Sequence, residues 1–172
     1  MSNKPFLIAI SGCKNSGKTT LITKLIPKFC EKGYKVATIK HDGHDFQGDQ
    51  VGTDTYKHKE AGAYGTAIFS DNKFMIIKED NFIDETYIIN LFPEADIILL
   101  EGFKSSDYPK LEIIRKGNST RPICNENNLI CILSDIDVIE GNYNIIDLNN
   151  TDLIAEIILD YMKSCYKDTC YK

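Results

Sequence analysis

The sequence contains no apolar stretch that approaches the roughly 20 residues a helix needs to cross a bilayer. It also lacks a long run of charges of either sign, since 20 basic residues stand among 25 acidic ones and the formal net charge is −5. Such a chain has neither the basic surface of a nucleic-acid-binding protein nor the polybasic patch of a membrane-bound one. We therefore expect a soluble protein whose ligand is a small polar molecule or another protein.

Paired cysteine motifs are missing as well. The six cysteines form neither a CxxC pair nor the spacing of a zinc site, and the N-terminus has no apolar region or cleavage site of a signal peptide. We therefore expect a cytoplasmic protein with reduced, mostly inert thiols. The length of 172 residues predicts a single domain over the whole chain, with a dispensable tail after about residue 163.

Short apolar runs typical of buried parallel strands recur along the chain. They lie at residues 6–10, 35–39, 96–100 and 129–133. Amphipathic patterns between and after these runs predict helices from Lys18 to a stop at Gly33, at 53–61, at 84–91 and from Thr151 onward. Residues 67–77 read as two apolar runs around a polar turn, which predicts a β-hairpin. The alternation predicts an α/β fold in three layers, with a mainly parallel sheet, an antiparallel hairpin and helices on both faces.

Polar residues follow each of the four predicted strands. These residues are Ser11-Gly12, Lys40-His41-Asp42, Glu101-Gly102 and Ser134-Asp135. The carboxyl ends of parallel strands meet at one edge of a sheet, and ligands of open α/β sheets bind there. The sequence therefore predicts a single site at this edge.

The segment after the first strand matches the phosphate-loop pattern G-x-x-x-x-G-K-[ST] in its required place, between a strand and a helix. This pattern adds the P-loop NTPase class to the fold prediction. Backbone amides of such a loop and the positive end of the following helix surround the β-phosphate. Lys18 can reach the β and γ oxygens, Thr19 can ligate Mg²⁺ and Thr20 faces the α-phosphate. The predicted nucleotide-binding residues here are Gly12, Cys13, Lys14, Asn15, Ser16, Gly17, Lys18, Thr19 and Thr20.

A second acid is needed to hold the magnesium ion. The run DIILLEG ends in Glu101, where the acid of a Walker B strand would stand. Glu101 either binds the metal through water, or polarises the attacking water, or merely caps the next turn. We predict Lys18 and Glu101 as the catalytic residues.

The segment KHDGHDFQGD, residues 40–49, gathers histidines, aspartates and a lysine. A loop that closes over the γ-phosphate would use Lys40 and Asp42; a transition-metal site around the two histidines and a merely solvated loop are the alternatives. Asp54 reaches the same site as a third metal ligand beside Thr19 and Glu101, or serves as an ordinary helix cap.

Asp135 follows the last buried run. A carboxylate there can accept hydrogen bonds from guanine, although capping of its own turn explains it equally well. No Asn-Lys or Thr-Lys pair adjoins it, so the residues alone do not distinguish GTP from ATP.

These motifs together resemble the molybdopterin-guanine dinucleotide biosynthesis protein B family. The phosphate loop is followed by KHDGHDF, DTYKHKEAGA and LLEGFKSSDYPKLEIIRKG in the order and spacing of that family, over roughly residues 5–135. The stretch from Glu101 to Glu112 is the most specific part, because a phosphate loop alone serves many functions. Gly43 stands where many relatives carry a histidine or another polar residue, which weakens a histidine cluster.

The resemblance implies a GTP-binding protein that uses Mg²⁺, forms a homodimer and hydrolyses GTP weakly. It also implies a partner, the molybdopterin guanylyltransferase that joins GMP to the molybdenum-bearing pterin, and possible contact with molybdopterin itself. The residues that match the family's nucleotide loop are Gly12, Asn15, Gly17, Lys18, Thr19 and Thr20, with Glu101 as the acid and Lys40, His41, Asp42 and Asp54 in its loop-and-helix segment.

Two other classes of function fit a phosphate loop. A small-molecule kinase needs several arginines in a lid over the transferred phosphoryl group, whereas Arg115 and Arg121 lie beyond Glu101 in the sequence. A nickel-insertion GTPase needs cysteine or histidine ligands at metal spacing, which the scattered cysteines do not provide. The sequence therefore favours a GTP-binding accessory protein.

Overall fold

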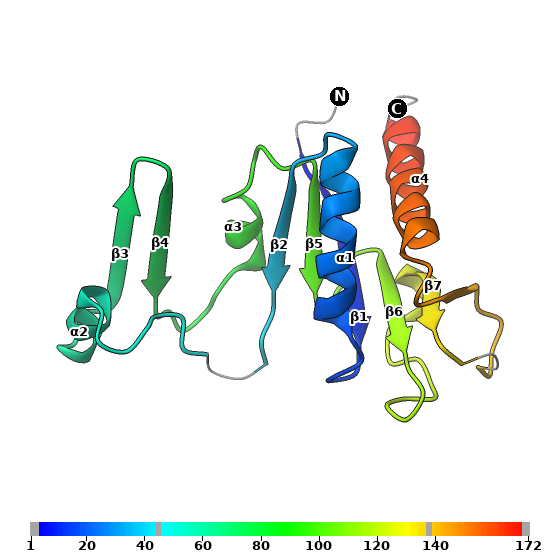
Figure 1. Ribbon diagram of the computed structural model, residues 1–172, viewed down its shortest axis with the longest axis horizontal. Helices are drawn as coiled ribbons and strands as arrows, with labels where there is room; N and C mark the ends of the chain where they lie inside the picture. Colours follow the sequence, from blue (N-terminus) through cyan, green and yellow to red (C-terminus); the bar gives the residue numbers. More distant parts are fainter. Residues whose placement is uncertain (1–3, 44–45, 137–138, 170–172) are drawn as a thin grey trace. The chain divides into compact units, whose positions relative to one another are not determined.

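The computed structural model describes residues 4–43, 46–136 and 139–169, and divides the chain into two compact units (Figure 1). The first unit comprises residues 1–41 and 88–172, and the second comprises residues 42–87. This division into units does not test the expectation of a single domain, which stays a prediction. Within the described ranges, no helix has the length and apolar character needed to cross a membrane.

A six-stranded sheet forms the first unit. Its strands are β1 (Phe6–Gly12), β2 (Val36–Lys40), β5 (Ile97–Glu101), β6 (Lys110–Ile114), β7 (Leu129–Ser134) and β8 (Ile145–Asp147), in the order β2-β5-β1-β6-β7-β8. Every neighbouring pair is parallel. The carboxyl ends therefore share one edge, which confirms the predicted parallel sheet.

Helices α1 (Lys18–Glu31) and α4 (Thr151–Thr169) lie side by side over one face of this sheet (Figure 1). Leu25 and Phe29 of α1 and Ile158 of α4 are fully buried in the core cluster on this face. The helix α1 stops before Gly33, whose φ of +87° is the left-handed conformation expected of a helix stop. Helix α4 continues to Thr169, and Cys165 packs against the core. The expectation of a dispensable tail stays a prediction.

The other face has a thinner cover than the expected helical layer. Ile89, the last residue of the short α3 (Glu85–Ile89), packs there on Ala9 and Leu100. Phe103 and Tyr108 from the connection between β5 and β6 complete this cluster. The connection thus crosses the sheet face as a series of turns and bends instead of as a helix.

Strand β6 was missed by the sequence prediction because two of its residues are charged. Lys110 and Glu112 alternate with apolar residues, yet they are 0% and 1% exposed. The Lys110 ammonium donates to the carbonyl oxygens of Phe103 at 3.2 Å and Ser106 at 2.5 Å. Its protons satisfy carbonyls that the crossing chain buries, where an unpaired polar group would be costly.

The Glu112 carboxylate has the same kind of partners, since it accepts hydrogen bonds from the amides of Ile123 at 2.8 Å and Cys124 at 3.0 Å. Burial, and then the neighbouring Glu112, raise the pKa of the Cys124 thiol to about 12. Burial alone raises the pKa of Cys131 to about 12. Both thiols are therefore protonated and inert near neutral pH.

The second unit holds α2 (Asp54–Glu60) and a two-stranded sheet of β3 (Gly65–Ser70) and β4 (Lys73–Lys78). The strands are antiparallel, with Ser70 opposite Lys73 across the turn, which confirms the predicted hairpin. The missed elements of the chain, besides β6, are the short β8 and a 3-10 turn at Glu126–Asn128.

We predict that Lys110→Met lowers the free energy of unfolding by about 2 kcal/mol, because it leaves the Ser106 carbonyl without its lysine donor and removes one of the donors to the Phe103 carbonyl. Urea denaturation measures the change. The control is Lys163→Met, an exposed lysine of α4 paired with Asp160, which should leave the midpoint where it is. Equal midpoints for the two variants would contradict a structural role of the Lys110 ammonium.

Candidate nucleotide site

The phosphate loop lies between β1 and α1, at the carboxyl edge of the sheet, and its backbone requires glycine. A Cβ on Gly12 would come within 2.7 Å of the Ile113 carbonyl oxygen. Gly12, Asn15 and Gly17 all have positive φ, at +138°, +61° and +101°. Left-handed residues within such a loop turn successive backbone N–H groups toward one concave side. The loop thus has the left-handed backbone expected of a phosphate loop, and phosphate binding by it stays a prediction.

Lys18 begins α1 and folds back over the loop. Its ammonium donates to the carbonyl oxygens of Cys13 at 2.7 Å and Gly12 at 3.2 Å. An ammonium has three protons, so these bonds hold the charge at the loop and leave a donor for a phosphate oxygen. Lys14 and Asn15 are exposed on the same loop.

Thr19 and Glu101 meet although 82 residues separate them, and the Thr19 hydroxyl donates to Glu101 Oε1 at 2.8 Å. The register explains the meeting. Strand β5 lies between β1 and β2, with Glu101 opposite both Ile10 and Lys40. A hydroxyl and a carboxylate are ligands that suit Mg²⁺, which takes few protein oxygens and keeps several waters.

These residues fit a magnesium nucleotide. The Ser16 hydroxyl is a buried oxygen with no hydrogen-bond partner in the described part of the chain, and it lies in the loop itself. Such a group in a native fold calls for an explanation, of which a ligand or a water is the simplest. The donor amides, the ammonium of Lys18 and the pair of Thr19 and Glu101 supply the positive charge and the oxygen ligands that a nucleotide with its magnesium ion needs.

Backbone contacts fix the chain around Glu101. The amide of His41 donates to the Glu101 carbonyl oxygen at 3.2 Å, and the Ser11 hydroxyl donates to the Gly102 carbonyl oxygen. Phe103 has a φ of +48°, an unusual value for an aromatic residue, and its ring packs edge-on against His41 at 5.8 Å between centroids. Strained backbone of this kind is held only where its surroundings over-determine it.

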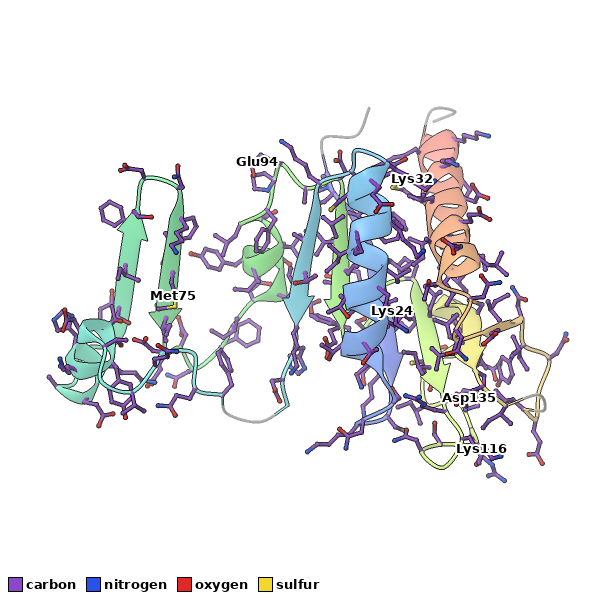
Figure 2. The ribbon with its side chains drawn as sticks, viewed as in Figure 1. Lys24, Lys32, Met75, Glu94, Lys116 and Asp135 are labelled. Carbon is purple, nitrogen blue, oxygen red and sulfur yellow. The ribbon has the colours of Figure 1, made fainter. Side chains whose placement is uncertain are left out.

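Asp135 stands at the end of β7 and already uses both carboxylate oxygens. One oxygen accepts a hydrogen bond from the Lys116 amide at 2.7 Å, and the other lies 3.5 Å from Arg115 Nε. Figure 2 shows Lys116 and Asp135 close together at this edge. These contacts favour the capping role over guanine recognition, which stays a prediction.

The sequence prediction missed two residues of the site because it missed β6. The side chain of Asn118 donates to the Lys14 carbonyl oxygen at 2.8 Å. Arg115 Nη1 lies 3.3 Å from the position that a Cβ of Gly17 would occupy. Arg115 lies beyond Glu101 in the sequence, but the parallel register returns it to the phosphate loop. The alternation of Lys110 and Glu112 with apolar residues after Pro109 was the signal of a strand, and that strand would have placed both residues beside the phosphate loop.

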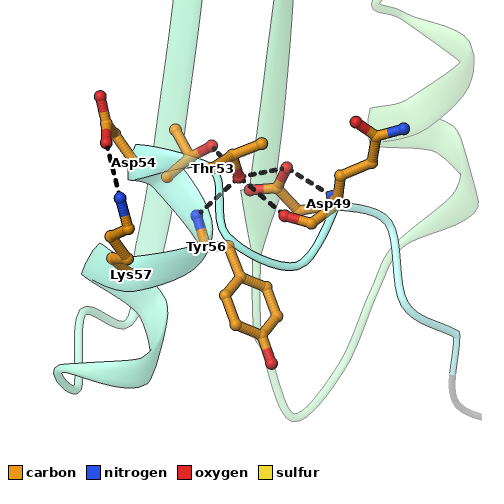
Figure 3. Close-up of polar contacts among 7 residues, drawn as sticks. Asp49, Thr53, Asp54, Tyr56 and Lys57 are labelled. Atoms are coloured by element: carbon orange, nitrogen blue, oxygen red, sulfur yellow. Dashed lines mark hydrogen bonds and ion pairs between the residues drawn. The ribbon is translucent and has the colours of Figure 1, made fainter.

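Asp54 belongs to the second unit, so its part in the site stays a prediction. Asp54 pairs with Lys57 at 3.3 Å at the start of α2, and Thr53 caps this helix by accepting a hydrogen bond from the Tyr56 amide at 3.2 Å (Figure 3). Asp49 takes part in the same network through Thr53 Oγ1 at 3.0 Å. The hydrogen bond from Thr55, with that from Thr53, lowers the pKa of the Asp49 carboxyl.

Lys40 ends β2 opposite Glu101, whereas Asp42 begins the second unit. His44 and Asp45, the middle of the proposed loop, lie outside the described residues. Within residues 4–43, 46–136 and 139–169, no group of three or more histidine, cysteine or acidic side chains has the arrangement of a metal site.

Comparison with known proteins links most of the chain to one family. Residues 7–135 match the family of molybdopterin guanine dinucleotide synthesis protein B. The molybdopterin-guanine dinucleotide biosynthesis adapter protein of Haemophilus influenzae is 30% identical over 165 residues, which cover 94% of this chain and 92% of that protein. The protein of the same name from Escherichia coli K12 is 29% identical over 91% of this chain and 93% of its own length.

Solved structures share the fold. A crystal structure of molybdopterin-guanine biosynthesis protein B superposes with a TM-score of 0.67 at 23% identity, over 92% of this chain and 99% of that one. The MobB homologue from Bacillus stearothermophilus has the same TM-score at 19% identity, over 92% and 98% of the two chains. The match to residues 7–135 covers most of the chain, and the chain therefore belongs to the molybdopterin guanine dinucleotide synthesis protein B family.

Proposed function

We propose that this chain, an adapter protein in molybdopterin-guanine dinucleotide biosynthesis, works by binding GTP with Mg²⁺ and by assisting the molybdopterin guanylyltransferase. The proposal includes weak GTP hydrolysis. Dimer formation, which the family resemblance implies, stays a prediction.

The hydrogen bond between Thr19 and Glu101, 2.8 Å long at the start of α1, carries this proposal. It joins the hydroxyl of the phosphate-loop motif to an acid on the neighbouring strand. A bound magnesium ion would neutralise charge on the β- and γ-phosphates. Thr19 and Glu101 would hold that ion, Lys18 would neutralise the same oxygens from the other side, and the loop amides would orient the phosphate chain.

The choice of GTP is supported by the relatives, since both adapter proteins are named for a dinucleotide that contains guanine. A protein that senses GTP would link the adapter to the nucleotide from which that dinucleotide is made. Asp135 at the end of β7 is the residue at the expected base position, although its present partners are Lys116 and Arg115.

The places of the two arginines support the proposal of slow hydrolysis. Arg115 adjoins Gly17 and pairs with Asp135, whereas Arg121 lies 4.0 Å from Glu140. Neither stands with Glu101 on the β5 side of β1. A GTPase without an arginine at the γ-phosphate turns over slowly, and slow turnover suits a protein whose GTP-bound form is recognised by a partner.

We predict that Glu101→Gln lowers Mg²⁺-dependent GTP hydrolysis at least about tenfold, equivalent to about 1.4 kcal/mol of barrier, and weakens GTP binding less. Loss of the carboxylate charge removes the metal ligand while the amide keeps the side chain's shape. Single-turnover phosphate release measures the rate. Glu94→Gln, an exposed carboxylate before β5 (Figure 2), is the matched control. A greater loss in the control than in Glu101→Gln would remove Glu101 from the mechanism.

We predict that the wild-type chain raises the yield of dinucleotide in a reconstitution with purified guanylyltransferase, GTP, Mg²⁺ and molybdenum-loaded pterin, and that Lys18→Ala does not. The substitution removes the charge that binds the phosphates but no core contact, so the fold should persist. Lys24→Ala, an exposed residue further along α1 (Figure 2), should behave as wild type. If wild type and Lys18→Ala gave the same yield, and sedimentation showed no complex, the adapter role of the nucleotide site would be refuted.

A further inference from the structure

Arg115 follows β6 directly, and its side chain lies against the phosphate loop. The guanidinium lies close to Gly17, since its Nη1 atom is 3.3 Å from the position that a Cβ of residue 17 would occupy. Gly17 is the N-cap of α1, so this cation lies at the positive end of a 14-residue helix. The side chain is 50% exposed and open to a ligand from solvent.

The electrostatics of this position favour an anion. Lys18 holds its ammonium over the same loop, and Lys14 is exposed on it. A third cation at the positive end of a helix raises the energy of the free protein. Asp135 offsets part of that charge from 3.5 Å, but its shorter hydrogen bond, 2.7 Å, goes to the Lys116 amide.

The backbone that carries Arg115 is fixed in place. Its carbonyl oxygen accepts hydrogen bonds from the amides of Asn118 at 2.9 Å and Ser119 at 3.1 Å. The Asn118 side chain then ties the turn to the phosphate loop through the Lys14 carbonyl oxygen at 2.8 Å. The backbone beneath the guanidinium is thus already ordered before a ligand binds, which lowers the entropic cost of binding at this position.

The side of the loop on which Arg115 lies decides which phosphates it can meet. The sheet order places β5 on one side of β1 and β6 on the other. Glu101 and Thr19, the proposed magnesium ligands, therefore mark the γ-phosphate side, and Arg115 lies on the opposite side. A nucleotide whose γ-phosphate lay beside Glu101 would turn its α- and β-phosphates toward Arg115.

We propose that Arg115 binds the α- and β-phosphates of the nucleotide at the N-terminus of α1 and exchanges part of its contact with Asp135 for them. The inference rests on the proposed nucleotide site and adds to it a residue outside the phosphate-loop motif. A guanidinium can bind two phosphate oxygens in parallel, and such charge-assisted bonds are strong.

Calorimetric titration of Arg115→Ala with GTP, GDP and pyrophosphate tests the proposal. Each ligand carries at least two linked phosphates, so the affinity for all of them should fall about tenfold or more, the effect of losing one charge-assisted contact. Arg121→Ala is the matched control, because it removes the chain's other arginine, which is 81% exposed. It should bind each ligand as wild type does. Arg115→Lys keeps the positive charge but cannot bind two phosphate oxygens in parallel, so it should lose less affinity than Arg115→Ala. It replaces the alanine variant in the test if that variant does not fold.

The outcomes separate this inference from the proposed function. Wild-type protein that binds neither GTP nor GDP would refute the nucleotide site itself. If wild type binds GTP and Arg115→Ala binds equally well, only the role of Arg115 is refuted. If Arg115→Ala lost affinity for GTP alone, the arginine would contact the γ-phosphate. If its affinity for pyrophosphate were unchanged, the arginine would contact the ribose or the base. Either result would overturn the proposal.

Discussion

The parallel pairing of β1 with β5 on one side and β6 on the other is the constraint on which the site depends. It sets Ile10 opposite Glu101 and Gly12 opposite Ile113. The first pairing brings an acid to Thr19, and the second leaves no room for a Cβ on Gly12. Glu101, the phosphate loop and Arg115 are therefore placed by one set of backbone hydrogen bonds, and a slip in register would separate all of them.

The polar residues buried on β6 maintain this arrangement. The chain after Glu101 crosses the sheet face opposite α1 and α4 before it enters β6. This crossing buries the carbonyls of Phe103 and Ser106, to which Lys110 donates hydrogen bonds. Glu112 does the same for two amides of the later loop. The stretch from Glu101 to Glu112, the most specific part of the family resemblance, thus has a structural explanation. It fixes the acid at the phosphate loop without a helix in the connection itself.

Sequence patterns predicted the parts of the fold in which local chemistry and burial agree. The phosphate loop, the apolar strands and the hairpin at Ser70 to Lys73 follow directly from glycine spacing and period-2 or continuous apolar runs. Strand β6 could not be predicted in this way, because Lys110 and Glu112 are charged and their partners are backbone groups distant in sequence. The nearness of Arg115 to Gly17 was hidden for the same reason, since it depends on the position of β6 in the sheet.

The central claim is that the carboxyl edge of this sheet holds a guanine nucleotide. Titration of the wild-type chain with GTP and with ATP, each with Mg²⁺, in a calorimeter tests it most directly. The account predicts binding of GTP that saturates at equal amounts of ligand and chain, with ATP bound more weakly. No heat of binding for GTP, or tighter binding of ATP, would contradict it.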